Sequence, residues 1–133
     1  LVIAGTLCRA VNHVPKRVRV HYYGLLETEE EVYRLGNIFI NPMQTGTGLK
    51  IKTLEALAHG KAVLSTTEGA CGLSEFEGDS LIITDQPEEW IRVIHKLLDN
   101  EWDGISLGRS GEKVKKVLQE NLNRIKDSLS LQK

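Results

Sequence analysis

Short apolar runs alternate with longer amphipathic segments along most of the chain. Runs of about five residues that contain β-branched side chains are typical of strands buried on both faces of a parallel sheet, and the segments between them are typical of covering helices. The pattern therefore predicts an α/β fold with a mainly parallel sheet of about five strands flanked by helices. The predicted strands are residues 1–5, 18–23, 37–41, 61–65 and 80–84.

Two helices are predicted between the second and fourth strands. Thr28 precedes three glutamates and has the chemistry of an N-cap with an acidic first turn, so residues 29–35 are expected to be helical. A second helix is expected over residues 48–59, with Gly60 placed to end it as the C′ residue. Its predicted apolar stripe consists of Ile51, Leu54, Leu57 and Ala58.

Two further helices are predicted after the last strand. Asp85 is expected to cap a helix that has Pro87 in its first turn and ends near Asn100. A final helix is expected over residues 105–129. The predicted inward face of the helix after Asp85 consists of Trp90, Ile91, Val93, Ile94, Leu97 and Leu98.

Composition indicates an ordinary globular chain. Its 133 residues, 41% of them hydrophobic, suffice for one core and are too few for two, so we expect a single domain over residues 1–133. Seventeen Lys and Arg against eighteen Asp and Glu give a formal charge of −1, which supplies no electrostatic footprint for nucleic acid or an anionic membrane. Any anion site must therefore be local.

The cysteines, the hydropathy and the first residues of the chain indicate what kind of protein this is. Cys8 and Cys71 show neither metal-ligand spacing nor disulfide-rich density, which favours reduced thiols in a cytoplasmic protein without a metal site. No window approaches the roughly 20 apolar residues of a membrane-spanning helix. The chain begins inside a hydrophobic run without an initiator Met, so we expect it to be a fragment of a longer protein.

A glycine loop between the third strand and the following helix is the main candidate for chemistry. Gly46, Thr47 and Gly48 allow the backbone to approach a ligand closely, and backbone amides at a helix N-terminus can bind a phosphate. Lys50 and Lys52 add positive charge where an isolated helix favours anions, a local conflict that is more common at functional sites. The alternative is a solvated turn with two ordinary surface lysines.

Glu55 is the second candidate. It lies three residues after Lys52 and four before His59, so the three side chains share adjacent turns of one helix face. A carboxylate there could accept two hydrogen bonds from the hydroxyls of a ribose. The alternative is a surface pair with Lys52 or His59, which contributes roughly a few tenths of a kcal/mol.

The loop and helix together resemble a known family. Residues 46–63, GTGLKIKTLEALAHGKAV, continued by residues 65–73, STTEGACGL, resemble the donor-nucleotide-binding, C-terminal domain of group 1 (family 4) glycosyltransferases of the GT-B fold. Residues 1–5 and 31–42 are similar to two earlier segments of that domain, so the resemblance covers most of residues 1–98. It implies a Rossmann-like sheet that forms the C-terminal half of a GT-B fold and lacks its first strand and helix.

The resemblance also implies roles for individual residues. Glu55 would bind the ribose hydroxyls of the donor, and the backbone amides of residues 48–51 would face its diphosphate and sugar. No catalytic residue and no metal ligand is assigned. The donor-binding residues expected from the loop and the resemblance together are Gly46, Thr47, Gly48, Leu49, Lys50, Ile51, Lys52 and Glu55.

Two departures from the family pattern stand out. Many members carry a further glutamate where this chain has Thr47, so the usual carboxylate contact with the transferred sugar is missing. The Arg and Lys that neutralise the leaving diphosphate would precede or lie close to Leu1, and the acceptor-binding N-terminal domain would precede them. That missing domain is an expected partner of this chain.

The function implied by the resemblance is glycosyl transfer of the hexosyltransferase type. A sugar would pass, with retained configuration and without a metal or other cofactor, from a UDP- or GDP-linked donor to a saccharide or lipid-linked saccharide in polysaccharide biosynthesis. The fragment alone would be inactive, and the full-length protein would be cytoplasmic with peripheral association at the inner face of the membrane. Two alternatives stay open: a non-catalytic α/β interaction or regulatory module, which Thr47 favours, and another phosphate-binding α/β enzyme.

Overall fold

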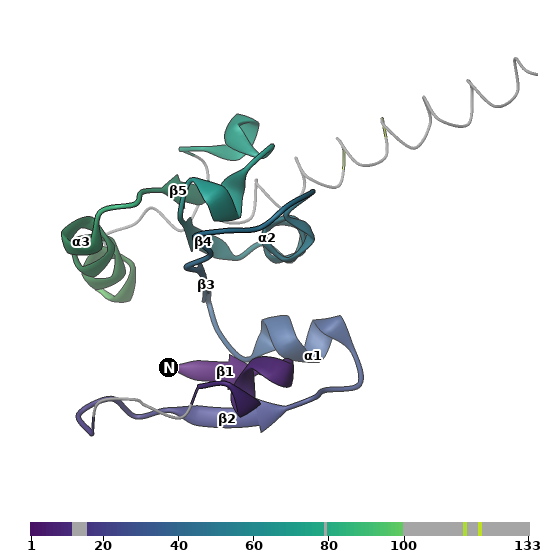
Figure 1. The fold of residues 1–133 in the computed structure, drawn as a ribbon, viewed down its shortest axis with the longest axis vertical. Helices are drawn as coiled ribbons and strands as arrows, with labels where there is room; N and C mark the ends of the chain where they lie inside the picture. The colour runs from purple at the N-terminus through teal and green to yellow at the C-terminus, as the bar shows by residue number, and fades with distance from the viewer. Residues whose placement is uncertain (12–15, 79, 100–115, 117–119, 121–133) are drawn as a thin grey trace, which may run out of the picture. The chain divides into compact units, whose positions relative to one another are not determined.

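A computed structural model describes residues 1–11, 16–78, 80–99, 116 and 120 (Figure 1). The chain divides into two compact units, Leu1–Asn37 and Ile38–Lys133. Both contain short helices and parallel strands, so the predicted α/β class is confirmed. All five predicted strands form, but within the described residues they make a two-stranded and a three-stranded sheet. The single-domain organisation stays a prediction.

The first unit is built on two neighbouring strands, β1 (Val2–Ala4) and β2 (His21–Gly24), which run parallel (Figure 1). A short 3₁₀ helix, η1 (Gly5–Arg9), follows β1, and α1 (Glu29–Arg34) follows β2. Thr28 caps α1 as predicted. Its hydroxyl accepts a hydrogen bond from the Glu31 amide at 3.3 Å, and the Glu31 carboxylate accepts one from the Thr28 amide at 3.1 Å. This reciprocal arrangement is a capping box.

The second unit contains a parallel sheet in the order β3 (Ile38–Asn41), β4 (Ala62–Ser65), β5 (Leu81–Ile83). The register pairs Ile38 with Ala62 and Val63 with Leu81. All four residues of the central strand β4 are buried. Strands buried on both faces are expected to be apolar throughout, and β4 is apolar up to its last residue, Ser65.

Helix α2 (Ile51–Ala58) crosses from β3 to β4 and ends as the sequence predicts. Gly60 has a φ of +69°, its amide donates to the Leu57 carbonyl at 2.9 Å, and the Lys61 amide donates to the Ala56 carbonyl at 3.0 Å. These two bonds form a Schellman motif, which requires a left-handed residue at C′ and so favours glycine.

The predicted inward face of α2 is partly wrong. Ile51 is 55% exposed, whereas Leu57 and Ala56 are fully buried. The third buried position is polar: Thr53 has no exposed surface. The buried face of the helix is thus Thr53, Ala56 and Leu57, and the polar Thr53 is accommodated there because its hydroxyl donates to the Gly69 carbonyl at 2.8 Å.

Helix α3 (Pro87–Leu98) follows β5, with Pro87 in its first turn as predicted. Its N-cap residue is Gln86, however, and not Asp85. Asp85 does not cap the helix because its carboxylate binds Thr67 instead. On the predicted inward face Val93 is buried, but Ile91 is 61% exposed.

Two short 3₁₀ helices, η2 (Glu68–Ala70) and η3 (Ser74–Phe76), connect β4 to β5. Phe76 is 1% exposed and is one of the largest fully buried side chains of this unit. The helix predicted over residues 105–129 lies outside the described residues, apart from the isolated positions 116 and 120. Among the helices that are described, none combines the length and apolar character needed to cross a membrane.

Candidate functional site

The candidate site lies at the carboxyl edge of the three-stranded sheet. Strands β3, β4 and β5 are parallel, so their last residues, Asn41, Ser65 and Ile83, lie at the same edge. In open α/β sheets this edge is where ligands bind. The glycine loop leaves β3 at this edge and leads into α2, and the η2 turn leaves β4 at the same edge.

The glycine loop, residues 42–49, is exposed over its whole length. Gly48 has a φ of +83°, a left-handed conformation that L side chains rarely adopt. This residue cannot continue into a right-handed helix, so α2 begins at Ile51 and not at residue 48 as predicted. The Ile51 amide donates to the Leu49 carbonyl at 3.0 Å. The amides of residues 48–50 therefore belong to a loop ahead of the helix.

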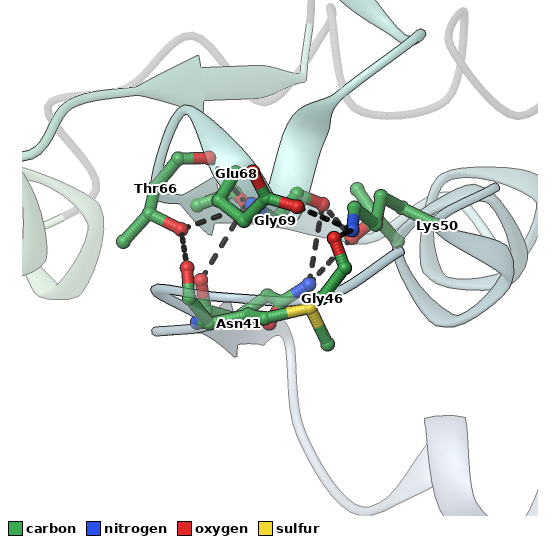
Figure 2. A network of polar contacts seen from close by, with 9 residues as sticks. Asn41, Gly46, Lys50, Thr66, Glu68 and Gly69 are labelled. Carbon is green, nitrogen blue, oxygen red and sulfur yellow. Dashed lines mark hydrogen bonds and ion pairs between the residues drawn. The ribbon is translucent and has the colours of Figure 1, made fainter. Parts of the chain in front are cut away.

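Lys50, the N-cap residue of α2, is buried although the loop before it is exposed. Its side chain is 4% exposed, and its Nζ forms an ion pair with Glu68 Oε1 at 2.7 Å. The same Nζ donates to the Gly46 carbonyl at 3.3 Å (Figure 2). The side chain thus contacts both the glycine loop and the turn after β4, and its charge is compensated by Glu68.

A polar network joins β3, α2 and η2 beside this ion pair (Figure 2). The Gly69 carbonyl accepts hydrogen bonds from Thr53 Oγ1 at 2.8 Å and from Asn41 Nδ2 at 3.2 Å. Asn41 Nδ2 also donates to Thr53 Oγ1 at 2.9 Å. The Thr66 hydroxyl accepts from the Gly69 amide at 3.0 Å and donates to the Met43 carbonyl. Buried polar groups that find partners in this way fix the arrangement of the elements that carry them.

Gly69 is fixed by close packing. A Cβ atom at this position would lie 2.5 Å from Ser65 Oγ and 2.9 Å from two atoms of the Asn41 side chain. We expect Gly69→Ala to destabilise the unit by about 1–3 kcal/mol, because a well-packed neighbourhood must shift to admit the methyl group. Denaturant unfolding measures this loss. Adding Ser65→Ala, which removes the nearest clashing atom, should restore part of it, and equal stability of Gly69→Ala and wild type would contradict the packing argument.

Glu55 and Lys52 lie on the outer part of α2. Lys52 Nζ and Glu55 Oε2 form an ion pair at 2.8 Å, with side chains that are 67% and 20% exposed. This is the surface pair that the spacing offered as the alternative to ribose binding. The pair does not exclude a ligand role, because i,i+3 ion pairs on a helix contribute only roughly a few tenths of a kcal/mol.

Asp85 is a further acidic group at the same edge of the sheet. It accepts from the Thr67 hydroxyl at 2.7 Å and from the Thr67 amide at 2.9 Å, and these hydrogen bonds lower the pKa of Asp85. The Thr84 hydroxyl, followed by Arg92, lowers the pKa of Glu89. Hydrogen bonds to the charged form of a carboxyl group favour that form.

The direction of the Asp85 shift gives a pH prediction. A carboxyl group with a lowered pKa stabilises the fold above its ordinary value of 3.8, and this contribution is lost as the pH falls through the lower folded value. We expect Asp85→Asn to be less stable than wild type at neutral pH and the difference to shrink below pH 3.8. Urea unfolding midpoints of the two proteins, measured from neutral pH to below pH 3.8, give this difference in stability. A difference that does not change with pH would contradict the lowered pKa of Asp85.

Several residues of this edge are absent from the set expected from sequence. The structure brings the expected residues Gly46 and Lys50 together, and likewise Lys52 and Glu55. It adds Glu68 and the network of Asn41, Thr53, Thr66 and Gly69. The available signal was the polar residue that ends β3, Asn41, and the polar residues Thr66 and Glu68 after β4, since residues at the carboxyl ends of parallel strands meet at one edge.

Metal-ligand side chains do not gather in the described part of the chain, where no group of three or more His, Cys, Asp and Glu residues could hold a metal ion. Cys71 is exposed and Cys8 donates its thiol hydrogen to the Ile3 carbonyl at 3.2 Å. The polar groups at this sheet edge include the Asn41 amide, the Asp85 carboxylate and the ion pair of Lys50 with Glu68.

Comparison with known proteins identifies a relative and a family that this chain resembles. One relative, from Klebsiella pneumoniae, is described as an uncharacterized 44.6 kDa protein in cps region and is 37% identical over 92 residues. The match covers 62% of this chain and 24% of the relative, so it spans about a quarter of that protein. Residues 1–100, which include both sheets, the glycine loop and α2, match the family described as glycosyl transferases group 1. The chain belongs to this family of glycosyl transferases.

Proposed function

We propose that this chain is the donor-binding part of a glycosyltransferase that transfers a sugar from a nucleotide-diphosphate sugar to an acceptor. The observation that carries the proposal is the exposed glycine loop at the carboxyl edge of a parallel sheet, in a chain that belongs to the glycosyl transferases of group 1. Glycine loops at this position let backbone amides approach a diphosphate.

The donor would be bound by the glycine loop and by the helix α2 that follows it. The amides of residues 48–50 would face the diphosphate and sugar, together with Gly46 and Thr47. The Ile51 amide, which the sequence also offered for this role, already donates to the Leu49 carbonyl at 3.0 Å. Lys52 lies in the first turn of α2 and is 67% exposed, so its ammonium can turn toward a phosphate at little cost. Glu55, one turn later, would accept hydrogen bonds from the ribose hydroxyls.

The chemistry requires little acid–base work from this part of the enzyme. Departure of a nucleoside diphosphate leaves negative charge on its phosphates and positive character on the sugar, so preorganised donors at the leaving group lower the barrier. Backbone amides and Lys52 would supply these donors. The reaction is proposed to need no metal, and chelation by EDTA should leave the activity of the full-length enzyme unchanged.

The finer assignments are part of the same proposal. The donor is UDP- or GDP-linked, the transferred group is a hexose, its configuration is retained, and the acceptor is a saccharide or lipid-linked saccharide. The relative in a cps region is compatible with a place in polysaccharide biosynthesis. We place the full-length protein in the cytoplasm, in peripheral contact with the membrane, and its acceptor-binding domain would be supplied by the rest of the polypeptide.

Titration calorimetry of the 133-residue chain with UDP and with GDP tests donor binding. We expect saturable heat with one of them, and weaker binding of the corresponding nucleoside and of inorganic phosphate. Absence of heat with both nucleotides would contradict the proposal. Saturation by phosphate alone would favour another phosphate-binding α/β enzyme.

A non-catalytic interaction or regulatory module is the second candidate. It is favoured by Thr47, which departs from the glutamate that the family resemblance implies at this position, and by the ion pair that compensates the charge of Lys50. Transfer activity of the full-length protein separates the two candidates. A protein that binds nucleotide without hydrolysing or transferring the donor sugar would be such a module.

A further inference from the structure

Lys50 is the feature of this edge that the proposed donor site leaves unexplained. Its side chain is 4% exposed, while residues 42–49 immediately before it are all exposed. The ammonium is not directed into solvent at the helix N-terminus, where it would meet an anion. It donates back to the Gly46 carbonyl within the loop and across to the Glu68 carboxylate (Figure 2).

Glu68 lies on a turn whose backbone is fixed by hydrogen bonds and close packing. It is the first residue of η2, and the next residue, Gly69, accepts from Thr53 and Asn41 and donates to Thr66. Gly69 also has no room for a Cβ atom against Ser65 and Asn41. These contacts fix the backbone of the turn beside Glu68, so the ion pair of Lys50 with Glu68 ties the glycine loop to a fixed part of the fold.

Lys50 is therefore a link between a rigid turn and the glycine loop. On one side it contacts the turn after β4 through Glu68, and on the other it contacts the loop after β3 through Gly46. Without the link, a loop with glycines at positions 46 and 48 would sample many backbone conformations, because glycine loses more conformational freedom on ordering than any other residue.

We propose that Lys50 and Glu68 form a positioning pair that holds the glycine loop in its donor-binding conformation, and that Lys50 does not itself bind the diphosphate. The proposal rests on the proposed function and makes Glu68, an acidic residue, necessary for binding an anion. Glu68 acts through Lys50 and has no contact with the donor. The loop amides, Lys52 and Glu55 bind the donor directly.

Glu68→Gln distinguishes this arrangement from two others by the sign of its effect. Removing a negative charge near an anionic ligand strengthens binding if the charge only repels the ligand. It also strengthens binding if Glu68 competes with the diphosphate for Lys50. If Glu68 and Lys50 position the loop, Glu68→Gln weakens binding, because the donor-binding conformation of the loop becomes a minor one. If only about one tenth of the molecules keep that conformation, the apparent Kd rises about tenfold.

The binding experiment is calorimetry with UDP and GDP on wild type and four variants. Glu68→Gln and Lys50→Met should each raise the Kd about tenfold, and the double variant should raise it no further, because each change breaks the same link. Glu77→Gln, which removes one exposed charge after η3, is the matched control and should not weaken binding. Tighter binding by Glu68→Gln, unchanged binding, or additive losses in the double variant would each overturn the positioning pair.

Hydrogen exchange of the ligand-free chain tests the pair independently of donor binding. The amides of residues 44–49 should exchange faster in Glu68→Gln than in wild type or Glu77→Gln, with the amides of β4 unchanged. Equal exchange of the loop in the three proteins would overturn the proposal. If wild type binds neither nucleotide, the proposed function fails, and the exchange result still decides whether Glu68 and Lys50 hold the loop.

Discussion

Leu57→Ala is expected to lower the free energy of unfolding by about 2–5 kcal/mol. Leu57 lies on α2 with no exposed surface, beside the buried residues of β4. Truncation removes apolar area from the core and leaves a cavity that the neighbouring side chains fill only in part, and both terms destabilise the fold. Urea unfolding followed by circular dichroism measures the loss as a shift of the midpoint.

Ile51→Ala is the matched control for this prediction. It is an aliphatic residue of similar size on the same helix, but it is 55% exposed. Its truncation should cost less than about 1 kcal/mol, since alanine is also the better helix former. Comparable losses in the two variants would show that both residues face the core, as the hydrophobic pattern alone predicts, and would contradict the burial described above.

The contrast between Leu57 and Ile51 shows which features of α2 the hydrophobic pattern predicts and which it does not. Spacing identified the helix, and the local chemistry of Thr28 and Gly60 identified the ends of α1 and α2. These signals act over three to six residues of sequence, so they are readable without the fold. The inward face of α2 is different, because Thr53 is buried by partners at Asn41 and Gly69, twelve and sixteen positions away.

In the candidate site, too, the features set by neighbouring residues were predictable and those set by distant residues were not. The position of the glycine loop between a strand and a helix was predictable, since β3, the loop and α2 are consecutive. The N-terminus of α2 was not, because the left-handed Gly48 delays the helix by three residues. The environment of Lys50 was not predictable either. Its partner Glu68 lies eighteen residues further along the chain and comes close to it only because β3 and β4 pair in parallel.

The two lysines of the site therefore have different expected roles, although they are two residues apart. Lys50 is 4% exposed and paired with Glu68, whereas Lys52 is 67% exposed and paired with Glu55 on its own helix. The buried Lys50 ammonium is costly to leave without its carboxylate, because its charge would stay buried and uncompensated, whereas the Lys52 ammonium is largely solvated. Lys50 thus anchors the loop, whereas Lys52, in the first turn of α2, is the lysine accessible to a ligand.

Glu55→Gln is expected to raise the Kd for the bound nucleoside diphosphate roughly 10- to 100-fold. Hydrogen bonds to a charged group contribute about 1.5–3 kcal/mol, and each 1.4 kcal/mol corresponds to a factor of about ten in affinity. If Glu55 only forms its surface pair with Lys52, the substitution should cost a few tenths of a kcal/mol of stability and leave affinity unchanged. Calorimetry with the nucleotide that binds wild type separates these outcomes.

The 2′-deoxy analogue of the same nucleotide makes the assignment to ribose specific. Wild type should bind the deoxy form more weakly, because one hydroxyl donor to Glu55 is absent, and Glu55→Gln should bind the two forms with more similar affinity. Glu30→Gln, which breaks the exposed pair with Arg34 at 2.7 Å on α1, is the control for losing a helix-surface ion pair and should behave as wild type. A Glu55→Gln variant that keeps the full preference for ribose over deoxyribose would place the hydroxyls on another residue.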